Sequence, residues 1–253
     1  MRHSIIAFFI LAMVATAFNT ATAQELSAME IVTKADQKVR GKTSQGSMKM
    51  TIIRPSWTRE MTMKSWSMGT EYSLILVTAP ARDKGTGFLK REKEIWNWQP
   101  SIDRVIKLPP SMMMQSWLGS DFTNDDLVRE SSMIEDYEHS LLGSEKIDGR
   151  DCYKIQLIPK EDAPVVWGKL LVWIDKTDFI QMKTEFYDED GYLVNTMLGK
   201  NIKEMGGRML ASVLEVVPEE EEGHKTRIEY LDIKFDEPIQ DSFFSIQNLK
   251  RVK

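Results

Sequence analysis

The feature that most constrains the fold is an alternation of apolar and polar residues with a period of 2, which begins near residue 46. Met48, Met50 and Ile52 alternate with polar residues, and Met61 and Met63 do the same after a short break. Because successive side chains of a strand point to opposite faces, these five residues are predicted to share the concave face of a sheet. Similar segments recur about every 10–14 residues, too closely for helical crossovers, so the predicted sheet is antiparallel and built from hairpins.

The alternation fails in one long segment between residues 109 and 142. Pro109 and Pro110 end a strand pattern, and Thr123 with Asp126 indicates the start of a short helix further on. The segment is therefore predicted to contain one or two short helices with loops, inserted between two halves of the sheet.

A clear amphipathic helix is predicted before the first strand, over residues 28–40. Ser27 and Glu30 have the spacing of a capping box, and Gly41 stands where such a helix would end. One face of this helix is apolar and must lie against another element.

An antiparallel sheet of about eleven strands must either form a two-sheet sandwich or curl into a barrel. Amphipathic helices without a second sheet to cover favour the curled sheet. The predicted fold is mainly β with a few α-helices: an unclosed antiparallel β-barrel of about eleven strands, with helices lidding an apolar cavity. Residues 24–253 are predicted to form one domain.

Residues 1–23 have the features of a cleavable secretory signal peptide. Arg2 supplies the positive start, residues 5–18 form an apolar run, and Ala21 and Ala23 give the small-x-small pattern that precedes cleavage before Gln24. An uncleaved membrane anchor is the alternative, which the short apolar run disfavours. The sequence thus predicts a soluble, periplasmic product.

Charge and cysteine usage exclude some classes of protein. The chain has a net charge of −5, whereas a nucleic-acid partner would favour a basic face, so no nucleic acid is expected as a partner. Cys152 is the sole cysteine, which rules out an intrachain disulfide and indicates a small buried apolar residue.

The residues that could perform catalysis are few. His139 and His224 are the two histidines beyond the leader, and neither lies in a recognisable catalytic or metal-binding motif. The acidic run of residues 219–222 is interpreted as a solvated turn. Neither an enzyme, a metal site nor a cofactor is predicted.

Methionine and tryptophan are the more informative residues, because methionine suits surfaces that accept variable apolar shapes. A methionine stripe can equally be ordinary core, and this pattern alone leaves both interpretations open. A curled sheet with helices over its mouth favours a cavity. The candidate cavity residues are Met48, Met50, Ile52, Met61, Met63, Leu74, Leu76, Trp96, Met112, Met113, Met114, Trp117 and Leu118.

The middle segment also carries a resemblance to a known family. Residues 114–127, with the sequence MQSWLGSDFTNDDL, resemble the signature of the LolA-like outer-membrane lipoprotein-sorting proteins. The leader followed by a helix, Arg54-Pro55 near a strand turn, and an ending over residues 239–249 with two adjacent phenylalanines are similar too. The resemblance spans essentially the whole chain beyond the leader.

This resemblance implies a half-barrel that carries lipoprotein acyl chains or other lipids across the periplasm, toward the outer membrane or to and from an exporter. The implied partners are acyl chains, an inner-membrane exporter and an outer-membrane receiver. The family's carrier holds its lid with a strand arginine bound to backbone carbonyls, and Arg54 or Arg59 lies in a comparable region here. The alternative is an envelope scaffold that docks on a membrane transporter and has a fully packed interior.

Overall fold

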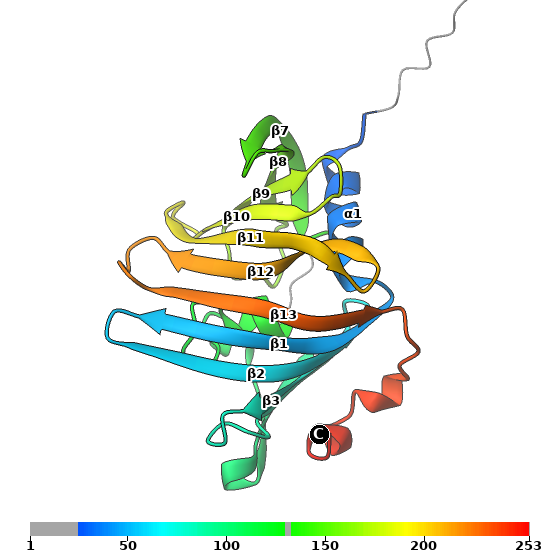
Figure 1. Ribbon diagram of the computed structural model, residues 1–253, viewed down its shortest axis with the longest axis vertical. Coiled ribbons are helices and arrows are strands. Elements are labelled where there is room, and N and C mark those ends of the chain that lie inside the picture. Colours follow the sequence, from blue (N-terminus) through cyan, green and yellow to red (C-terminus); the bar gives the residue numbers. More distant parts are fainter. Residues whose placement is uncertain (1–24, 130–132, 253) are drawn as a thin grey trace, which may run out of the picture.

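The computed structural model describes residues 25–129 and 133–252 and consists mainly of one antiparallel sheet with thirteen strands (Figure 1). Its spatial order is β6-β5-β4-β3-β2-β1-β13-β12-β11-β10-β9-β8-β7. Neighbouring strands of the sheet are consecutive in the chain except at the centre, where the first strand, β1, pairs with the last, β13. The strands are β1 (Thr43–Arg54), β2 (Trp57–Met68), β3 (Tyr72–Ala79), β4 (Gly87–Arg91), β5 (Glu94–Gln99), β6 (Arg104–Lys107), β7 (Tyr137–Ile147), β8 (Arg150–Pro159), β9 (Lys169–Asp175), β10 (Gln181–Tyr187), β11 (Leu193–Met205), β12 (Arg208–Pro218) and β13 (Lys225–Phe235).

The sheet curls without closing, because β6 and β7 lie at its two ends and do not pair with each other. This confirms the predicted mainly β fold and the unclosed barrel. The strand count of thirteen exceeds the eleven or so predicted.

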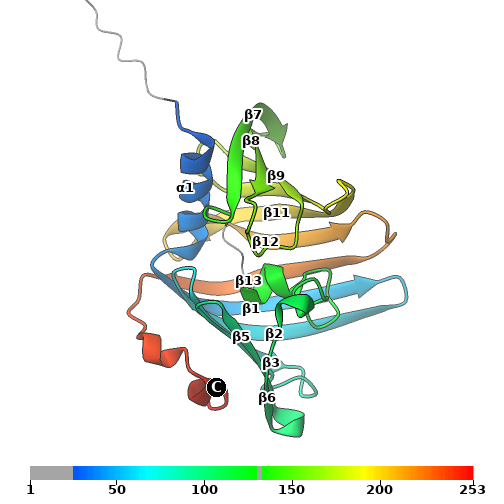
Figure 2. The same ribbon diagram turned by 180° about the vertical axis from the view of Figure 1, so that it is seen from behind.

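Helix α1 (Ala28–Arg40) covers the concave face at the β7–β12 end of the sheet (Figure 2). The predicted capping box is present: the Ser27 side chain accepts from the Glu30 backbone N–H, and the Glu30 carboxylate accepts from the Ser27 backbone N–H. Ile31, Val32 and Ala35 form the buried stripe of the helix and pack with residues of β8 and β9. The apolar face predicted from the sequence is thus the face that meets the sheet.

The segment that connects the edge strands β6 and β7 covers the other part of the concave face (Figure 2). Its first described part, residues 108–129, is called the insert. It contains the 3-10 turn η2 (Pro110–Met112) and the π-helical turn η3 (Asp125–Arg129). The predicted helix start is confirmed, since the Thr123 Oγ1 accepts from the Asp126 backbone N–H at 3.1 Å.

The C-terminal residues lie against the opposite, convex face of the sheet (Figure 1). They form the 3-10 turn η4 (Asp241–Phe243) and the short helix α2 (Ile246–Leu249), and a further 3-10 turn, η1 (Pro100–Ile102), follows β5. Phe244 and Leu249 are buried there with side chains of β3, β4 and β5. The two faces of this end of the sheet are therefore covered by different parts of the chain.

Cys152 is buried on β8 and free, as predicted. Residues 1–24, which include the predicted signal peptide and its cleavage site, lie outside the described residues. Within residues 25–129 and 133–252, no helix is both long and apolar enough to cross a membrane.

Candidate functional site

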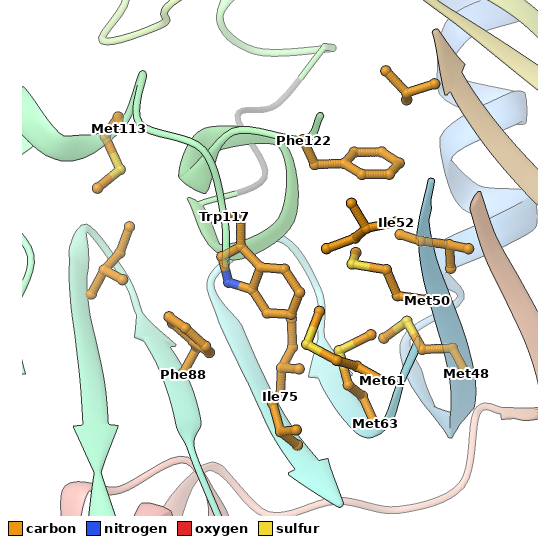
Figure 3. Packing of buried hydrophobic residues seen from close by; sticks show 14 residues of the cluster. Met48, Met50, Ile52, Met61, Met63, Ile75, Phe88, Met113, Trp117 and Phe122 are labelled. Atoms are coloured by element: carbon orange, nitrogen blue, oxygen red, sulfur yellow. The ribbon is translucent and has the colours of Figure 1, made fainter. Parts of the chain in front are cut away.

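The insert packs onto a methionine-rich patch of the concave face (Figure 3). Met50, Met61 and Met63 are fully buried beneath it on β1 and β2. Trp117 of the insert is 1% exposed, and its ring centroid lies 5.1 Å from that of Phe88 on β4. The insert is therefore packed as tightly as a core element, and it fills this end of the half-barrel.

Two strand arginines hold the insert through its backbone. Leu118 and Gly119 both have positive φ values, of 52° and 81°, and form a tight turn at the tip of the insert. The Leu118 carbonyl accepts from Arg59 Nη1 at 3.2 Å, and the Gly119 carbonyl accepts from Arg54 Nη2 at 3.1 Å. Arg59 is itself positioned by an ion pair with Asp83 at 2.7 Å.

Asp121 ties the insert to the sheet through its side chain, which is 4% exposed. Its carboxylate pairs with Arg54 at 2.9 Å and accepts a hydrogen bond from Thr226 Oγ1 of β13 at 2.6 Å. The Asp121 backbone N–H in turn donates to Thr226 Oγ1 at 3.0 Å. Because buried charges need partners, this network fixes the insert over the junction of β1 and β13.

A cavity of about 310 Å³ lies between the insert, α1 and the concave face. Phe122, Leu127, Met48, Met197 and Ile228 form part of its apolar wall. The volume is at the lower end of the range that proteins use for small ligands, about 300–1,000 Å³. The insert and α1 thus leave a space on the concave face that neither fills.

The same cavity has a polar end, near the C-terminus of α1. Four serines of three neighbouring strands line it: Ser44 on β1, Ser65 and Ser67 on β2, and Ser73 on β3. Ser44 pairs with Ser67 and Ser67 with Ser73 across the strands, so three of the hydroxyls form a row. The cavity is therefore amphipathic, with an apolar part beside the insert and a hydroxyl-lined part beside α1.

The loop before β9 closes one wall of the cavity. Trp167 of this loop is buried, and its Nε1 donates to the Asp126 carboxylate of the insert at 3.0 Å. Burial raises the pKa of Asp126 above its ordinary value of 3.8, against the lowering effect of the hydrogen bonds from Thr123 and Trp167. The insert is therefore linked to both halves of the sheet, by Arg54 and Arg59 on one side and by Trp167 on the other.

A wider hollow of about 800 Å³ adjoins the cavity and shares Asp121, Phe122 and Trp167 with it. One group among the described residues has metal-ligand spacing here: Asp121, Glu221 and His224 carry ligand atoms within 4.8 Å of one another. The Asp121 carboxylate is already committed to Arg54 and Thr226, and the Arg54 guanidinium beside it repels a cation. The Asp121 carboxylate of this group is thus explained by the attachment of the insert.

Comparisons with known proteins agree on the fold and the family. A family model described as an uncharacterized protein matches residues 69–251, more than half of the chain. A putative outer membrane lipoprotein-sorting protein domain from Vibrio parahaemolyticus is 25% identical, with a TM-score of 0.79, covering 88% of this chain and 98% of that one. A LolA superfamily protein from Nitrosomonas europaea is also 25% identical, with a TM-score of 0.76, over 88% of this chain and 99% of that one. The chain belongs to the uncharacterized family of that model, and its fold is LolA-like.

A DUF1329 family protein from Desulfovibrio piger shares the LolA-like fold, at 23% identity and a TM-score of 0.78 over 88% of this chain and 97% of that one. No curated protein matches the sequence. In this LolA-like half-barrel, the arginine contacts converge on the insert, which covers the concave face between the edge strands.

The predicted cavity residues are distributed among three environments. Met48 lines the cavity itself. Met114 is 52% exposed and lines the wider hollow, and Met112 and Leu118 are partly buried against the core. The remaining predicted residues belong to the packed core between the insert and the concave face: Met50, Ile52, Met61 and Met63 on the sheet, and Met113 and Trp117 on the insert.

Three predicted residues lie on the other face of the sheet. Leu74 and Leu76 of β3 and Trp96 of β5 pack in the cluster that the C-terminal segment covers. Residues 74–77 are a continuous apolar run because β3 is buried on both faces, and alternation then turns Ile75 and Val77 toward the insert. Their assignment to the cavity is corrected accordingly.

The serines of the cavity were missed because a strand serine is common and carries no motif. A signal was nevertheless available in the register. Ser65 and Ser67 continue the period of 2 from Met61 and Met63, so they share the same face of β2. Trp167 offered no comparable signal, since it lies in a loop without periodicity.

Proposed function

We propose that this LolA-like protein is a periplasmic carrier that binds one acyl chain or similar hydrophobic molecule in the cavity on its concave face. The observation that carries the proposal is an amphipathic cavity of about 310 Å³ enclosed by an insert that polar side chains attach to the sheet. The similar structure from Vibrio parahaemolyticus, described as a putative outer membrane lipoprotein-sorting protein domain, supports the same class of function. An inner-membrane donor and an outer-membrane receiver would then load and unload the carrier.

The energy of binding comes from burial. Each methylene that moves from water into an apolar cavity gains about 0.8 kcal/mol, which over about ten methylenes gives roughly 8 kcal/mol before ordering costs. Such a gain supports affinities in the micromolar range. Movement of the insert would expose the methionine patch beneath it and lengthen the apolar path, because the insert lies directly on Met50, Met61 and Met63. A carrier needs no catalytic group.

The proposal is tested by titrating the protein with the uncharged methyl ester of dansyl-labelled undecanoic acid and following its fluorescence. The wild type should bind the probe with a micromolar Kd. Met197→Trp places a large side chain in the cavity wall and should weaken binding at least tenfold. Leu231→Trp is the matched control, because Leu231 is half exposed on β13 and does not line the cavity, and it should bind like the wild type. A wild type that binds no probe would favour the packed envelope scaffold instead.

The attachment of the insert predicts a kinetic effect. Arg59→Ala removes the hydrogen bond to the Leu118 carbonyl and should release the probe several times faster, since the insert then opens more easily. Arg104→Ala on the exposed edge strand β6 is the control. Release measured by stopped-flow dilution that is equally fast in all three proteins would show that the insert does not gate the cavity.

A further inference from the structure

The hydroxyl-lined end of the cavity has two side chains without partners. Ser44 and Ser67 share a hydrogen bond of 2.8 Å between their Oγ atoms. Ser65 and Ser73 also line the cavity, yet neither side chain makes a hydrogen bond to any of the described residues. Ser73 is only 6% exposed and shares the concave face of β3 with Ile75. Both hydroxyls line the cavity and are free to bond a molecule there, so they indicate a place for a polar group of the ligand.

The charges around this cavity indicate what kind of polar group the ligand carries. Among the described residues that line it, Arg40 is the one basic side chain, and the three aspartates Asp121, Asp125 and Asp126 belong to the insert at the other end of the cavity. Arg40 is already paired with Asp36 at 3.1 Å. The C-terminus of α1 also lies at this end, and its last carbonyls accept hydrogen bonds from Arg208, which is paired with Asp236. A phosphate or carboxylate head beside the serines would find no free cation, which is unfavourable for a buried anion.

We infer that the cavity selects neutral amphiphiles whose head carries hydroxyl, ester or amide groups, with the head at Ser65 and Ser73 and the tail toward Phe122. This inference rests on the proposed function and names its substrate class. The serine hydroxyls can both donate and accept, so they match alcohols and esters alike. The apolar tail then lies along Met48, Ile75 and the insert, where no polar partner is needed.

The test is displacement of the dansyl probe by three ligands with the same eighteen-carbon chain: 1-monooleoylglycerol, oleate and oleyl phosphate. On the wild type, monooleoylglycerol should displace the probe at least tenfold more tightly than oleyl phosphate. Replacement of both Ser65 and Ser73 by alanine removes two neutral hydrogen bonds at nearly constant volume. This double variant should lose about tenfold in affinity for monooleoylglycerol, equal to 1.4 kcal/mol, and stay within twofold for oleyl phosphate.

Ser140→Ala is the matched control, because Ser140 is an exposed serine of the edge strand β7 and lies outside the cavity. It should leave all three affinities unchanged. Equal displacement by the three ligands, tighter binding of oleyl phosphate, or a uniform loss in the double variant would overturn the inference while leaving the carrier proposal intact. Absence of probe binding by the wild type would instead refute the carrier proposal itself. Melting temperatures within 2 °C of the wild type show that the variants are folded (for a chain of this size, about 1 kcal/mol shifts Tm by roughly 2–4 °C).

Discussion

Replacing Trp117 by alanine tests whether the insert is a core element or a loosely attached cover. The side chain is 1% exposed, packs on Phe88 and lies among the methionines of β1 and β2 (Figure 3). A tryptophan buries about 150–250 Å², which at about 25 cal/mol per Å² gives an upper estimate of roughly 4–6 kcal/mol. Comparable substitutions cost about 3–5 kcal/mol. The free energy of unfolding measured by urea denaturation should therefore fall by about 3–5 kcal/mol.

Two further variants make this measurement specific. Met114→Ala changes a half-exposed residue of the same insert and should cost less than about 0.5 kcal/mol. Trp117→Phe keeps an aromatic ring against Phe88 and removes the buried Nε1, which has no hydrogen-bond partner among the described residues. Because that orphan N–H is itself unfavourable, Trp117→Phe should cost less than half as much as Trp117→Ala. A Trp117→Ala loss below about 1 kcal/mol would refute the packed insert.

Three other predictions concern single contacts. Asp121→Ala leaves Arg54 buried without its partner and should destabilise the protein by about 3–5 kcal/mol, whereas the double variant that also carries Arg54→Met should recover much of this loss; a simple sum of the two losses would contradict the pairing. Because the pKa of Asp126 is raised in the folded protein, its carboxyl group ionises at a lower pH in the unfolded chain, and its contribution to stability is lost as the pH rises above the ordinary pKa of 3.8. The free energy of unfolding of Asp126→Asn, measured by urea denaturation, should therefore rise relative to that of the wild type between about pH 4 and 7. A difference between the two proteins that does not change with pH would contradict this. Gly46→Ala places a Cβ 2.3 Å from the Asp232 carbonyl oxygen and should lower Tm by several degrees, which thermal unfolding checks.

Much of the architecture followed from local patterns in the sequence. The capping box at Ser27 and Glu30 placed α1, and the period of 2 placed Met50 and Met63 on one face, because both are rules of backbone geometry. The insert was recognised by the failure of that period after Pro109. The features that depend on residues close together in the sequence could therefore be predicted.

The division between core and cavity depends on distant neighbours and could not be predicted in this way. Met48 borders the cavity and Met50 does not, because the insert covers Met50 and leaves Met48 open to the cavity. The course of the insert is set by tertiary contacts such as that of Arg54 with Asp121. Leu74 was placed on the wrong face for a related reason. A strand buried on both sides loses its alternation, and the C-terminal segment that buries Leu74 lies far away in the sequence.

The central claim, that the cavity beside the insert holds a hydrophobic ligand, is tested most directly by native mass spectrometry. Wild type and Met197→Trp would be purified without detergent from cells that export them. The carrier account predicts that the wild type retains an adduct of lipid mass, which gentle collisional activation releases, and that Met197→Trp is recovered bare. The account would be contradicted if neither protein carried an adduct, or if the wild type and the variant carried the same adduct in the same amount.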